Sequence, residues 1–344
     1  MAPVTNGRVL FNEIPAGYPE PGKTTVYDDS QKIDLERIPL NGGILIKTLF
    51  LSIDPYLRGR MRDASIPSYS PAFVLGEPLT NYGVGVVLRS ERAAFEPGDH
   101  VYGWFPFQQF FVAQDDDPKR PIRKLDDYKM PWSVYTGVCG MPGQTAYYGW
   151  KEFANPKPGD VAFVTAGAGP VGSMVIQLAK ADGLKVIASA GSEEKVAFIR
   201  DIGADVAFNY KTERTVDVLR REGPINVYWD NVGGESLDAA LETAATGANF
   251  IECGMITGYN GESYHVKNLD KIFAKRLKLF GHLVSPLHPK YQEQFYKEIP
   301  PRVARGEFKY TEDIKHGLHL AGHAIEDVQR GKNKGKSVVL VAEE

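Results

Sequence analysis

A glycine-rich turn near the middle of this sequence has the residue types and the spacing that bind a phosphate group. The segment Gly167-Ala168-Gly169-Pro170-Val171-Gly172 has the pattern G-x-G-x-x-G between an apolar run and an amphipathic helical pattern. In this setting we expect Gly167 to allow a tight turn and Gly169 to let a pyrophosphate approach the backbone. Gly172 would let the helix pack closely on the strand, and the helix N-terminus favours negative charge. The turn therefore predicts a dinucleotide site, with a plain strand–helix turn as the alternative.

The end of the next strand candidate indicates which nicotinamide cofactor the turn serves. A site for NAD usually has Asp or Glu there, about 20 residues on, to bind the ribose 2′-hydroxyl. This sequence has ASAGS at 188–192, without an acid. Ser192, Lys195 and Tyr210 could surround a 2′-phosphate, with Lys195 supplying charge-assisted hydrogen bonds. Alternatively, Ser192 is a helix N-cap and Lys195 a solvated helix residue. The two interpretations are compatible, and the missing acid favours NADP(H).

Cysteine and histidine content limits the metal chemistry. The only cysteines are Cys139 and Cys253, so a four-cysteine structural zinc site is impossible. His316, His319 and His323 are spaced three and four apart, and a helix would place them on one face. No Glu follows His319 in the H-E-x-x-H manner, and a metal site also needs further ligands. We therefore expect a polar helix face there, and no metal.

The elements that would position the glycine-rich turn follow from the change of pattern along the chain. Up to residue 121, more than half of the 23 prolines lie among short apolar stretches, which is typical of a compact β domain. From residue 160 on, β-type runs alternate with helical patterns, which indicates a parallel, doubly wound sheet. The expected strands are 161–166, 185–190, 205–208, 226–230, 248–252 and 277–283, and the expected helices are 171–181, 193–202, 216–222 and 235–245.

The last part of the chain combines a helix with a final β-type run. We expect the helix over 291–305, interrupted at Pro300 and Pro301 because proline removes a backbone donor and clashes with the preceding turn. The run 337–341 has no obvious partner nearby in the sequence. We expect it to return to the N-terminal β domain.

Bulk composition excludes several classes of partner. A length of 344 residues suggests two domains. The formal net charge of −3 gives no electrostatic reason to propose nucleic acid or an anionic membrane as a partner. No apolar run reaches the roughly 18 residues of a membrane span, and the first ten residues do not have the pattern of a signal peptide. With two cysteines, a cytoplasmic location is the default expectation.

Six further motifs extend in order along essentially the whole chain. They are SIDPYLRGRM at 52–61, GVGVV at 83–87, GMPGQTAY at 140–147, DNVGG at 230–234, CGMITGYN at 253–260 and GKNKGK at 331–336. Together they resemble the zinc-independent medium-chain reductases, specifically the prostaglandin reductase and alkenal double-bond reductase group. The resemblance implies an α/β fold, with a GroES-like β domain at 1–128 and 309–344 and a Rossmann NADP(H)-binding domain at 129–308. It also implies an enzyme, often a homodimer, that reduces the carbon–carbon double bond of small enals or enones.

The resemblance assigns cofactor roles to residues outside the glycine-rich turn. Three groups of residues would contact the adenosine 2′-phosphate, the pyrophosphate with the nicotinamide ribose, and the nicotinamide amide. In that order they are Ser192, Lys195 and Tyr210; Asn231 and the loop Cys253–Tyr259; and the backbone of His282, Leu283 and Val284, with Asn333 reaching the cofactor from the tail.

The resemblance also implies that tyrosines line the substrate-binding side of the site. Tyr56, Tyr82 and Tyr259 resemble tyrosines that line it, and Met141 is a candidate for the pocket floor. In an enone, hydride delivery to the β-carbon moves charge onto the carbonyl oxygen, which a phenol can stabilise by donating a hydrogen bond. Tyr259 follows a strand end, where ligands bind in this fold, and we predict that it and Tyr56 are catalytic. The role of Tyr259 could be to orient the cofactor, to stabilise the enolate or to relay a proton.

Several alternatives remain at this point. A quinone reductase of the same superfamily would use the same cofactor site on a wider acceptor, and a nicotinamide-binding sensor would show little turnover. A zinc-dependent alcohol dehydrogenase is disfavoured because SIDPY at 52–56 and GEP at 76–78 lack the expected cysteine and histidine. The basic cluster Arg58, Arg60 and Arg62 could attract an anionic substrate tail, but we expect it to be solvated.

Overall fold

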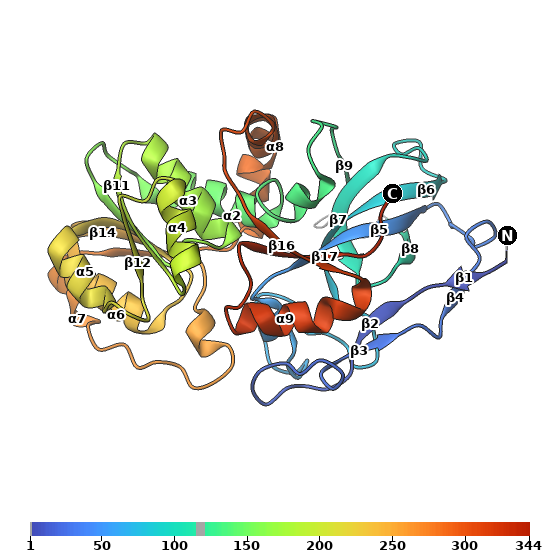
Figure 1. Ribbon diagram of the computed structural model, residues 1–344, viewed down its shortest axis with the longest axis horizontal. Helices are drawn as coiled ribbons and strands as arrows, with labels where there is room; N and C mark the ends of the chain where they lie inside the picture. The colour runs from blue at the N-terminus through green and yellow to red at the C-terminus, as the bar shows by residue number, and fades with distance from the viewer. Residues whose placement is uncertain (1, 115–120) are drawn as a thin grey trace. The chain divides into compact units, whose positions relative to one another are not determined.

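In the computed structural model, which describes residues 2–114 and 121–344, the chain divides into two units (Figure 1). One consists of Met1–Gly137 with Glu312–Glu344, and the other of Val138–Thr311. Each unit is built around its own sheet. Among the described residues, no helix is both long and apolar enough to cross a membrane.

A parallel sheet forms the centre of the unit Val138–Thr311, all of which is described, and it has six strands there. The chain first extends the sheet outward from its central strand and then returns to build the other half, so a switch point lies between β10 and β13. The inner strands are mostly buried, as apolar runs in a covered parallel sheet should be, whereas the edge strand β15 is largely exposed. In spatial order they are β12 (Val206–Asn209), β11 (Lys185–Ala190), β10 (Val161–Val164), β13 (Ile225–Asp230), β14 (Ala244–Glu252) and β15 (Lys278–Gly281).

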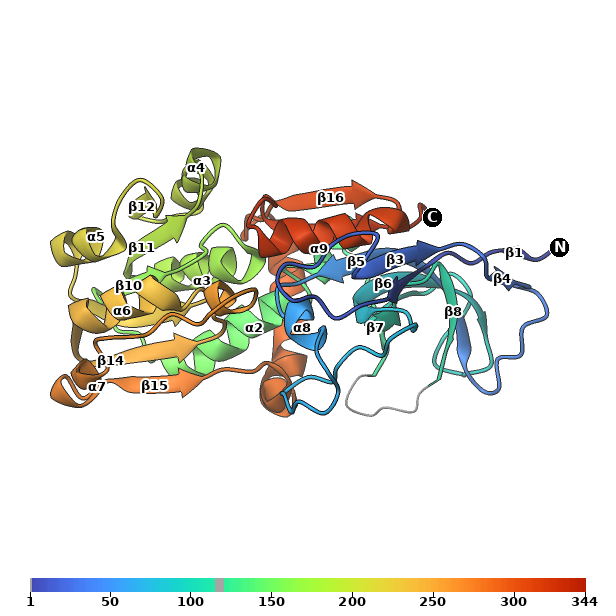
Figure 2. The same ribbon diagram turned by 90° about the horizontal axis from the view of Figure 1, so that it is seen from below.

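Helices connect these strands and can be followed in Figure 2. Their starts agree with local sequence: Pro170 occupies the first turn of one helix, and the Ser192 side chain accepts a hydrogen bond at the start of the next. The connecting helices are α3 (Pro170–Ala181), α4 (Glu193–Asp201), α5 (Thr215–Glu222) and α6 (Gly234–Thr243); the others are α2 (Met141–Gly149), η2 (Trp150–Ala154), η3 (Ile256–Gly258), α7 (Asp270–Ala274), η4 (Ser285–Leu287) and α8 (His288–Ala304).

The predicted doubly wound sheet is therefore confirmed, with two local corrections. The structure begins β14 at Ala244, where a helix over 235–245 was expected to continue. Helix α8 continues through Pro300 and Pro301, so the expected interruption is wrong. A proline inside a helix costs hydrogen bonding, but this helix buries an apolar face that includes Phe295 and Ile299, and that packing favours a continuous helix.

The unit Met1–Gly137 with Glu312–Glu344 contains a mostly antiparallel sheet of seven strands among its described residues. Strand β17 pairs antiparallel with β5 and parallel with β16, so the C-terminal run returns to the β domain as predicted (Figure 1). The sheet has the order β16 (Glu312–His316), β17 (Lys336–Leu340), β5 (Ile44–Ile53), β6 (Thr80–Ser90), β7 (His100–Pro106) and β9 (Arg123–Lys124), and β8 (Phe110–Ala113) pairs with β5.

Smaller elements complete this unit. Two short antiparallel pairs lie outside the main sheet, and α9 packs on β17 and β5. The elements are β1 (Val4–Thr5) with β4 (Lys32–Ile33), β2 (Arg8–Phe11) with β3 (Thr25–Asp28), α1 (Leu57–Arg60), η1 (Trp132–Thr136), η5 (Leu318–Leu320) and α9 (Ala321–Gln329).

The three spaced histidines do not share a helical face. His316 ends strand β16, His319 lies in η5, and His323 lies in α9. Gly317 between them has φ of 105°, a backbone conformation that breaks any helix at this point. The expectation of one polar helix face is therefore wrong.

Candidate functional site

The glycine-rich turn connects β10 to α3, and each of its glycines meets a different constraint. A Cβ on Gly172 would lie 2.5 Å from the Ala166 carbonyl oxygen, so this glycine permits close packing of helix on strand, as predicted. A Cβ on Gly169 would meet only that same oxygen, at 3.3 Å, among the described atoms within 4 Å. Gly169 therefore leaves one side of the turn open at the N-terminus of α3, where backbone N–H groups favour an anion.

Gly167 does not provide the tight turn that was predicted for it. The left-handed position of the turn is Ala166, with φ of 48°, whereas Gly167 has no positive φ. A Cβ on Gly167 would lie 3.1 to 3.2 Å from the side chains of Ile176, Ala188 and Ile199. Gly167 therefore serves tight packing between the strands and helices around it, rather than the turn itself.

Asn231 binds the ends of the two strands at the switch point together. Its side-chain Nδ2 donates to the Thr165 carbonyl oxygen at 2.7 Å, and its backbone N–H donates to Thr165 Oγ1 at 2.8 Å. Its Oδ1 accepts from the indole of Trp229 at 3.2 Å. Because these contacts fix the loop after β13 beside the end of β10, Asn231 shapes the edge of the sheet where a dinucleotide binds in this fold.

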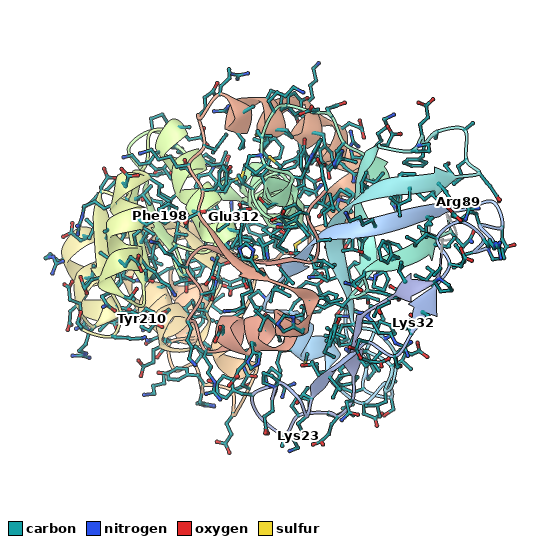
Figure 3. All side chains as sticks on the ribbon, turned by 45° about the vertical axis from the view of Figure 1, so that its right-hand side comes forward. Lys23, Lys32, Arg89, Phe198, Tyr210 and Glu312 are labelled. Atoms are coloured by element: carbon teal, nitrogen blue, oxygen red, sulfur yellow. The ribbon has the colours of Figure 1, made fainter. Side chains whose placement is uncertain are left out.

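The residues predicted for the adenosine 2′-phosphate come together at the ends of β11 and β12. Ser192 Oγ accepts from the Lys195 backbone N–H at 3.4 Å, which confirms the N-cap. A Cβ on Gly191 would lie 2.9 Å from the Tyr210 hydroxyl, so that ring crosses the backbone just before the cap. Tyr210 has 51% of its surface exposed at the outer part of this unit (Figure 3). Ser192 and Tyr210 thus lie together at this strand end, where residues 188–192 include no acid and the next residue, Glu193, accepts from Asn209 Nδ2 at 2.8 Å.

The ends of β13 and β14 carry a buried carboxyl pair that sequence reasoning missed. Asp230 and Glu252 are partners in the strand register. Asp230 Oδ1 accepts from the backbone N–H groups of Val232 and Gly233, each at 2.8 Å. Its other oxygen and both Glu252 oxygens are shielded from solvent, without a partner in standard hydrogen-bond geometry among the described residues. Register between adjacent strand ends was the only signal that could have found this pair.

The electrostatics of this pair follow from burial. Burial, together with the Asp230 charge, raises the pKa of Glu252 to about 8, and burial also raises the pKa of Asp230. Burial, assisted by the same two carboxyls, raises the pKa of the neighbouring Cys253 to about 12. The thiol of Cys253 is therefore neutral at physiological pH and is not a nucleophile.

The two loops after β14 and β15 hold the remaining predicted residues of this unit. Tyr259 ends η3, and a Cβ on Gly254 would lie 3.3 Å from its hydroxyl. His282 is buried, donates its backbone N–H to the Glu252 carbonyl oxygen and contacts the Thr145 carbonyl oxygen through Nε2 at 2.8 Å. Burial lowers the pKa of His282, so its imidazole is neutral and supports the loop structurally. Leu283 and Val284 follow it, with 43% of Leu283 exposed.

Met141 begins α2 in the same unit, but Asn333 belongs to the other one. The Thr145 hydroxyl contacts the Met141 carbonyl oxygen at 2.8 Å and its sulfur at 3.4 Å. Asn333 lies in the loop between α9 and β17, where its Nδ2 donates to the Gly335 carbonyl oxygen at 2.8 Å. A cofactor role for Asn333 and a pocket role for Met141 stay predictions.

The predicted substrate tyrosines of the β unit lie in an aromatic and polar environment. Tyr82 stacks on Tyr102 with ring centroids 5.5 Å apart and meets Trp104 edge-on at 5.2 Å. Tyr56 immediately precedes α1 and donates its hydroxyl proton to Asn81 Oδ1 at 2.5 Å. Burial, with the Asp54 charge adding to it, holds the pKa of Tyr56 well above its ordinary value. Tyr56 is thus a neutral phenol.

The arginine cluster near Tyr56 is not solvated as expected. Arg60 is buried, donates to the carbonyl and hydroxyl oxygens of Thr80, and lies 4.8 Å from the Trp104 ring centroid. Arg58 and Arg62 donate to backbone carbonyls of nearby loops. A guanidinium group has several donors in one plane, so each arginine can donate to more than one loop carbonyl at once. They therefore fix the segments around α1.

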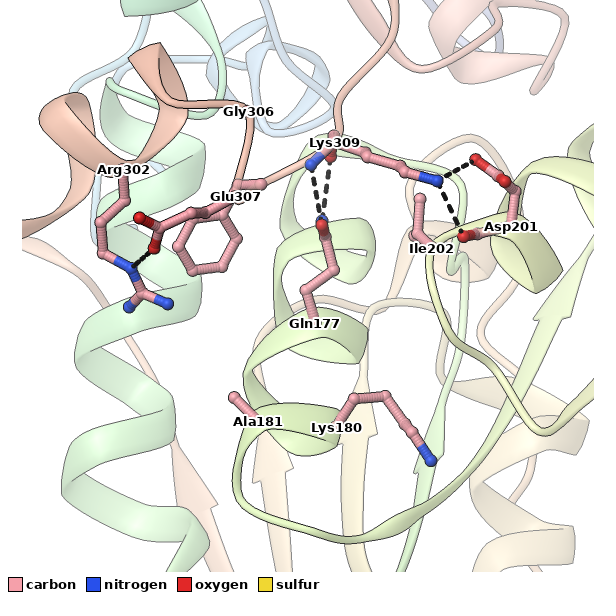
Figure 4. Close-up of a pocket in the computed structure, with 10 residues that line it drawn as sticks. Gln177, Lys180, Ala181, Asp201, Ile202, Arg302, Gly306, Glu307 and Lys309 are labelled. Atoms are coloured by element: carbon pink, nitrogen blue, oxygen red, sulfur yellow. Dashed lines mark hydrogen bonds and ion pairs between the residues drawn. The ribbon is translucent and has the colours of Figure 1, made fainter.

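A polar groove in the unit Val138–Thr311 lies at the other end of α3 from the glycine-rich turn (Figure 4). Its polar groups bind one another: Lys309 contacts Gln177 through its backbone and Asp201 through its ammonium, and Arg302 pairs with Glu307. None of the predicted site residues lines it. The groove is therefore not the dinucleotide site.

Comparison with known proteins agrees with this geometry. Residues 8–120 match a family described as the N-terminal domain of oxidoreductase, and residues 170–300 match one described as zinc-binding dehydrogenase. A zinc-type alcohol dehydrogenase-like protein of Schizosaccharomyces pombe is 39% identical, over 99% of this chain and 100% of that protein. An NADP(+)-dependent 2-alkenal reductase of Nicotiana tabacum is 38% identical, over 99% of each.

Solved structures give the same result. CurA of Vibrio vulnificus in complex with NADPH has a TM-score of 0.85 and 31% identity, over 98% of this chain and 100% of that one. A quinone oxidoreductase of Pseudomonas syringae, with a TM-score of 0.77 but only 21% identity over 97% and 99%, shares the fold alone. A Rossmann unit with a GroES-like β unit defines an oxidoreductase of the medium-chain class. Within that class, the chain belongs to the zinc-independent group of prostaglandin reductases and alkenal double-bond reductases.

The description of one family model includes zinc. Within residues 2–114 and 121–344, the structure has no group of three or more His, Cys, Asp or Glu side chains that could hold a metal ion. The SIDPY and GEP segments also lack the cysteine and histidine that zinc-bearing relatives need. Zinc independence of the reaction itself stays a prediction.

Proposed function

We propose that this chain is an NADPH-dependent reductase of the α,β carbon–carbon double bond of enals and enones. The observation that carries the proposal is the open turn at Gly169 combined with a strand end at 188–192 that has no acid. The likeness to a 2-alkenal reductase along 99% of the chain supports the substrate class.

NADPH supplies the hydride, which goes to the β-carbon of the substrate. The chain's own residues supply binding and orientation. The N-terminus of α3 would hold the pyrophosphate, and Ser192, Lys195 and Tyr210 would hold the 2′-phosphate. Asn231 holds the loop after β13 against Thr165 at the end of β10, beside the expected path of the cofactor. This set predicts a strong preference for NADPH over NADH.

The charge that develops on the substrate oxygen needs a donor in a water-poor site. Tyr259 is our candidate because its hydroxyl lies over Gly254, next to the loops at the carboxyl edge of the sheet. Tyr56 and Tyr82 would form part of the substrate wall. The α-carbon then takes a proton from a tyrosine, a ribose hydroxyl or water.

The test is NADPH oxidation by the purified chain against linear enals, cyclic enones, phenylpropenals and quinones, with identification of the products. We expect saturated aldehydes or ketones from the first three groups. Preferential turnover of quinones would support a quinone reductase instead. NADPH binding without turnover of any acceptor would support a sensor, and formation of an allylic alcohol would contradict double-bond reduction.

A further inference from the structure

A buried charged pair lies behind Tyr56 in the β unit. Lys336 from β17 donates through Nζ to the Ile53 carbonyl oxygen at 2.5 Å and to Asp54 Oδ1 at 3.1 Å. The two side chains are only 3% and 5% exposed. Burying an ion pair costs solvation free energy, so such a pair needs further hydrogen bonds to be stable. The remaining oxygen of Asp54 receives them.

Asn81 takes its orientation from this pair. Its Nδ2 donates to Asp54 Oδ2 at 2.9 Å and to the Ser52 carbonyl oxygen at 2.7 Å. Both of these oxygens can only accept in this arrangement, because Asp54 also accepts from Lys336 and from Ser52 Oγ. The nitrogen side of the Asn81 amide must therefore face them. An amide flip would place an oxygen against two acceptors and is excluded.

The orientation of Asn81 determines the direction of the Tyr56 proton. Asn81 Oδ1 lies 2.5 Å from the Tyr56 hydroxyl oxygen. An amide oxygen has no proton, so the hydrogen bond requires Tyr56 to be the donor. A phenol has one proton, and Tyr56 gives it to Asn81. What remains on the Tyr56 oxygen for a ligand is a lone pair.

We propose that Asn81, held by Asp54 and Lys336, is a positioning residue that makes the Tyr56 hydroxyl oxygen a hydrogen-bond acceptor toward the substrate. The proposal rests on the proposed function and adds one restriction to it. Tyr56 does not donate to the carbonyl oxygen of an enone, and a donor elsewhere stabilises the enolate. The group that meets Tyr56 is itself a donor, such as a hydroxyl group or a water molecule.

The surroundings of the network agree with a fixed protonation pattern. Glu312, labelled in Figure 3, accepts from Ser133 Oγ at 2.9 Å, and burial raises its pKa. The charge of an ionised Glu312 raises the pKa of Lys336, as the charge of Asp54 also does. Arg60 is a cation that acts on Tyr56, and its contacts to Thr80 fix it in place. None of these groups supplies a second proton to the Tyr56 oxygen through a hydrogen bond in the described part of the chain.

The test replaces Tyr56 in the full chain with ring-fluorinated tyrosines of decreasing phenol pKa. Fluorination makes the hydroxyl a better donor and its oxygen a poorer acceptor. We expect kcat/KM for an enal to stay level or fall along the series. A rise of about threefold or more per pKa unit, as a Brønsted relation for a donor requires, would overturn the proposal. The same series at Tyr18, which is 40% exposed, is the labelling control.

An Asn81→Ala variant tests the positioning role directly. This variant removes the acceptor of the Tyr56 proton. In its background, kcat/KM for an enal should therefore rise along the fluorotyrosine series as the phenol pKa falls. An unchanged slope would mean that Asn81 does not control the proton. Thermal unfolding and NADPH titration report whether the variant folds, and if it does not, the series in the unsubstituted chain still decides the question.

A spectroscopic measurement separates this proposal from the proposed function. In proton NMR, the Tyr56 hydroxyl should give a slowly exchanging low-field signal with an NOE to the Asn81 side chain, absent from Tyr56→Phe. This result is expected even if no enal is reduced, in which case only the proposed function fails. A Tyr56 proton in fast exchange with water, in a chain that does reduce enals, would contradict the proposal alone.

Discussion

Glu252 and Asp230 are register partners at the carboxyl ends of β14 and β13, so two carboxyl groups are buried side by side beneath the predicted cofactor loops. Asp230 fixes both loops: its Oδ1 accepts from Val232 and Gly233, and its backbone carbonyl oxygen accepts from Cys253 and Gly254. At neutral pH Glu252 holds a proton, because burial and the adjacent Asp230 charge raise its pKa to about 8. Ionisation of Glu252 should therefore destabilise the loops that Asp230 fixes.

The first prediction concerns the pH dependence of stability. The pKa of Glu252 is raised to about 8 in the folded chain, so its favourable contribution is complete below its ordinary pKa and is lost as the pH rises toward 8. We expect Glu252→Gln to raise Tm at pH 9 by about 2 to 4 °C, the shift that about 1 kcal/mol produces in a unit of this size. The difference should disappear near pH 5. Differential scanning calorimetry across this range measures it.

The control for this experiment is Glu262→Gln, since Glu262 is exposed. It should leave Tm unchanged at both pH values. A destabilised Glu252→Gln variant at pH 9 would show that the ionised carboxyl has a favourable partner, contrary to the electrostatics described above.

The second prediction concerns the close packing at the glycine-rich turn. A Cβ on Gly172 would lie 2.5 Å from the Ala166 carbonyl oxygen and 2.9 Å from Gly167 Cα, and both are backbone atoms that cannot move cheaply. We expect Gly172→Ala to destabilise the chain by about 1 to 3 kcal/mol and to weaken NADPH binding. Gly261→Ala, where a Cβ meets nothing within 4 Å, is the matched control. Chemical denaturation and fluorescence titration measure both, and equal behaviour of the two variants would refute the packing argument.

The third prediction concerns cofactor preference. If Lys195 contacts the 2′-phosphate, Lys195→Ala removes a charge-assisted hydrogen bond that NADH cannot make. We expect the Kd for NADPH to rise at least about tenfold, equivalent to about 1.4 kcal/mol, while the Kd for NADH changes little. Arg200→Ala, on the same helix, should change neither. Equal losses for NADPH and NADH would remove the basis for the assignment of Lys195.

The fourth prediction concerns Tyr259. Its hydroxyl lies at the edge of Gly254, in the loop that Asp230 fixes. We expect Tyr259→Phe to lower kcat by roughly tenfold, as the loss of one well-placed donor or proton relay does. Tm and NADPH affinity should be unchanged because the ring remains. Steady-state kinetics with an enal and a thermal melt suffice, and an unchanged kcat would exclude an essential hydroxyl.

The sequence by itself determined the central part of this protein. The positions of six strands, the glycine-rich turn, the Ser192 cap and the absence of an acid at residues 188–192 are local features, which depend on the types and spacing of neighbouring residues. The return of the final strand to the β domain was also predicted, but its second pairing, with β16 nearby in the sequence, was not.

Tertiary structure alone decided the polar network behind Tyr56 and the elements that depart from the local sequence pattern. Lys336 meets Asp54 across 282 residues, and no local period reports such a contact. Packing of an apolar face continued α8 through Pro300 and Pro301, because burial can outweigh a local preference. The direction of the Tyr56 proton likewise depends on Asn81, whose amide orientation is imposed by groups from distant strands. The chemistry available at a side chain is set by its neighbours in space, which only the folded chain brings together.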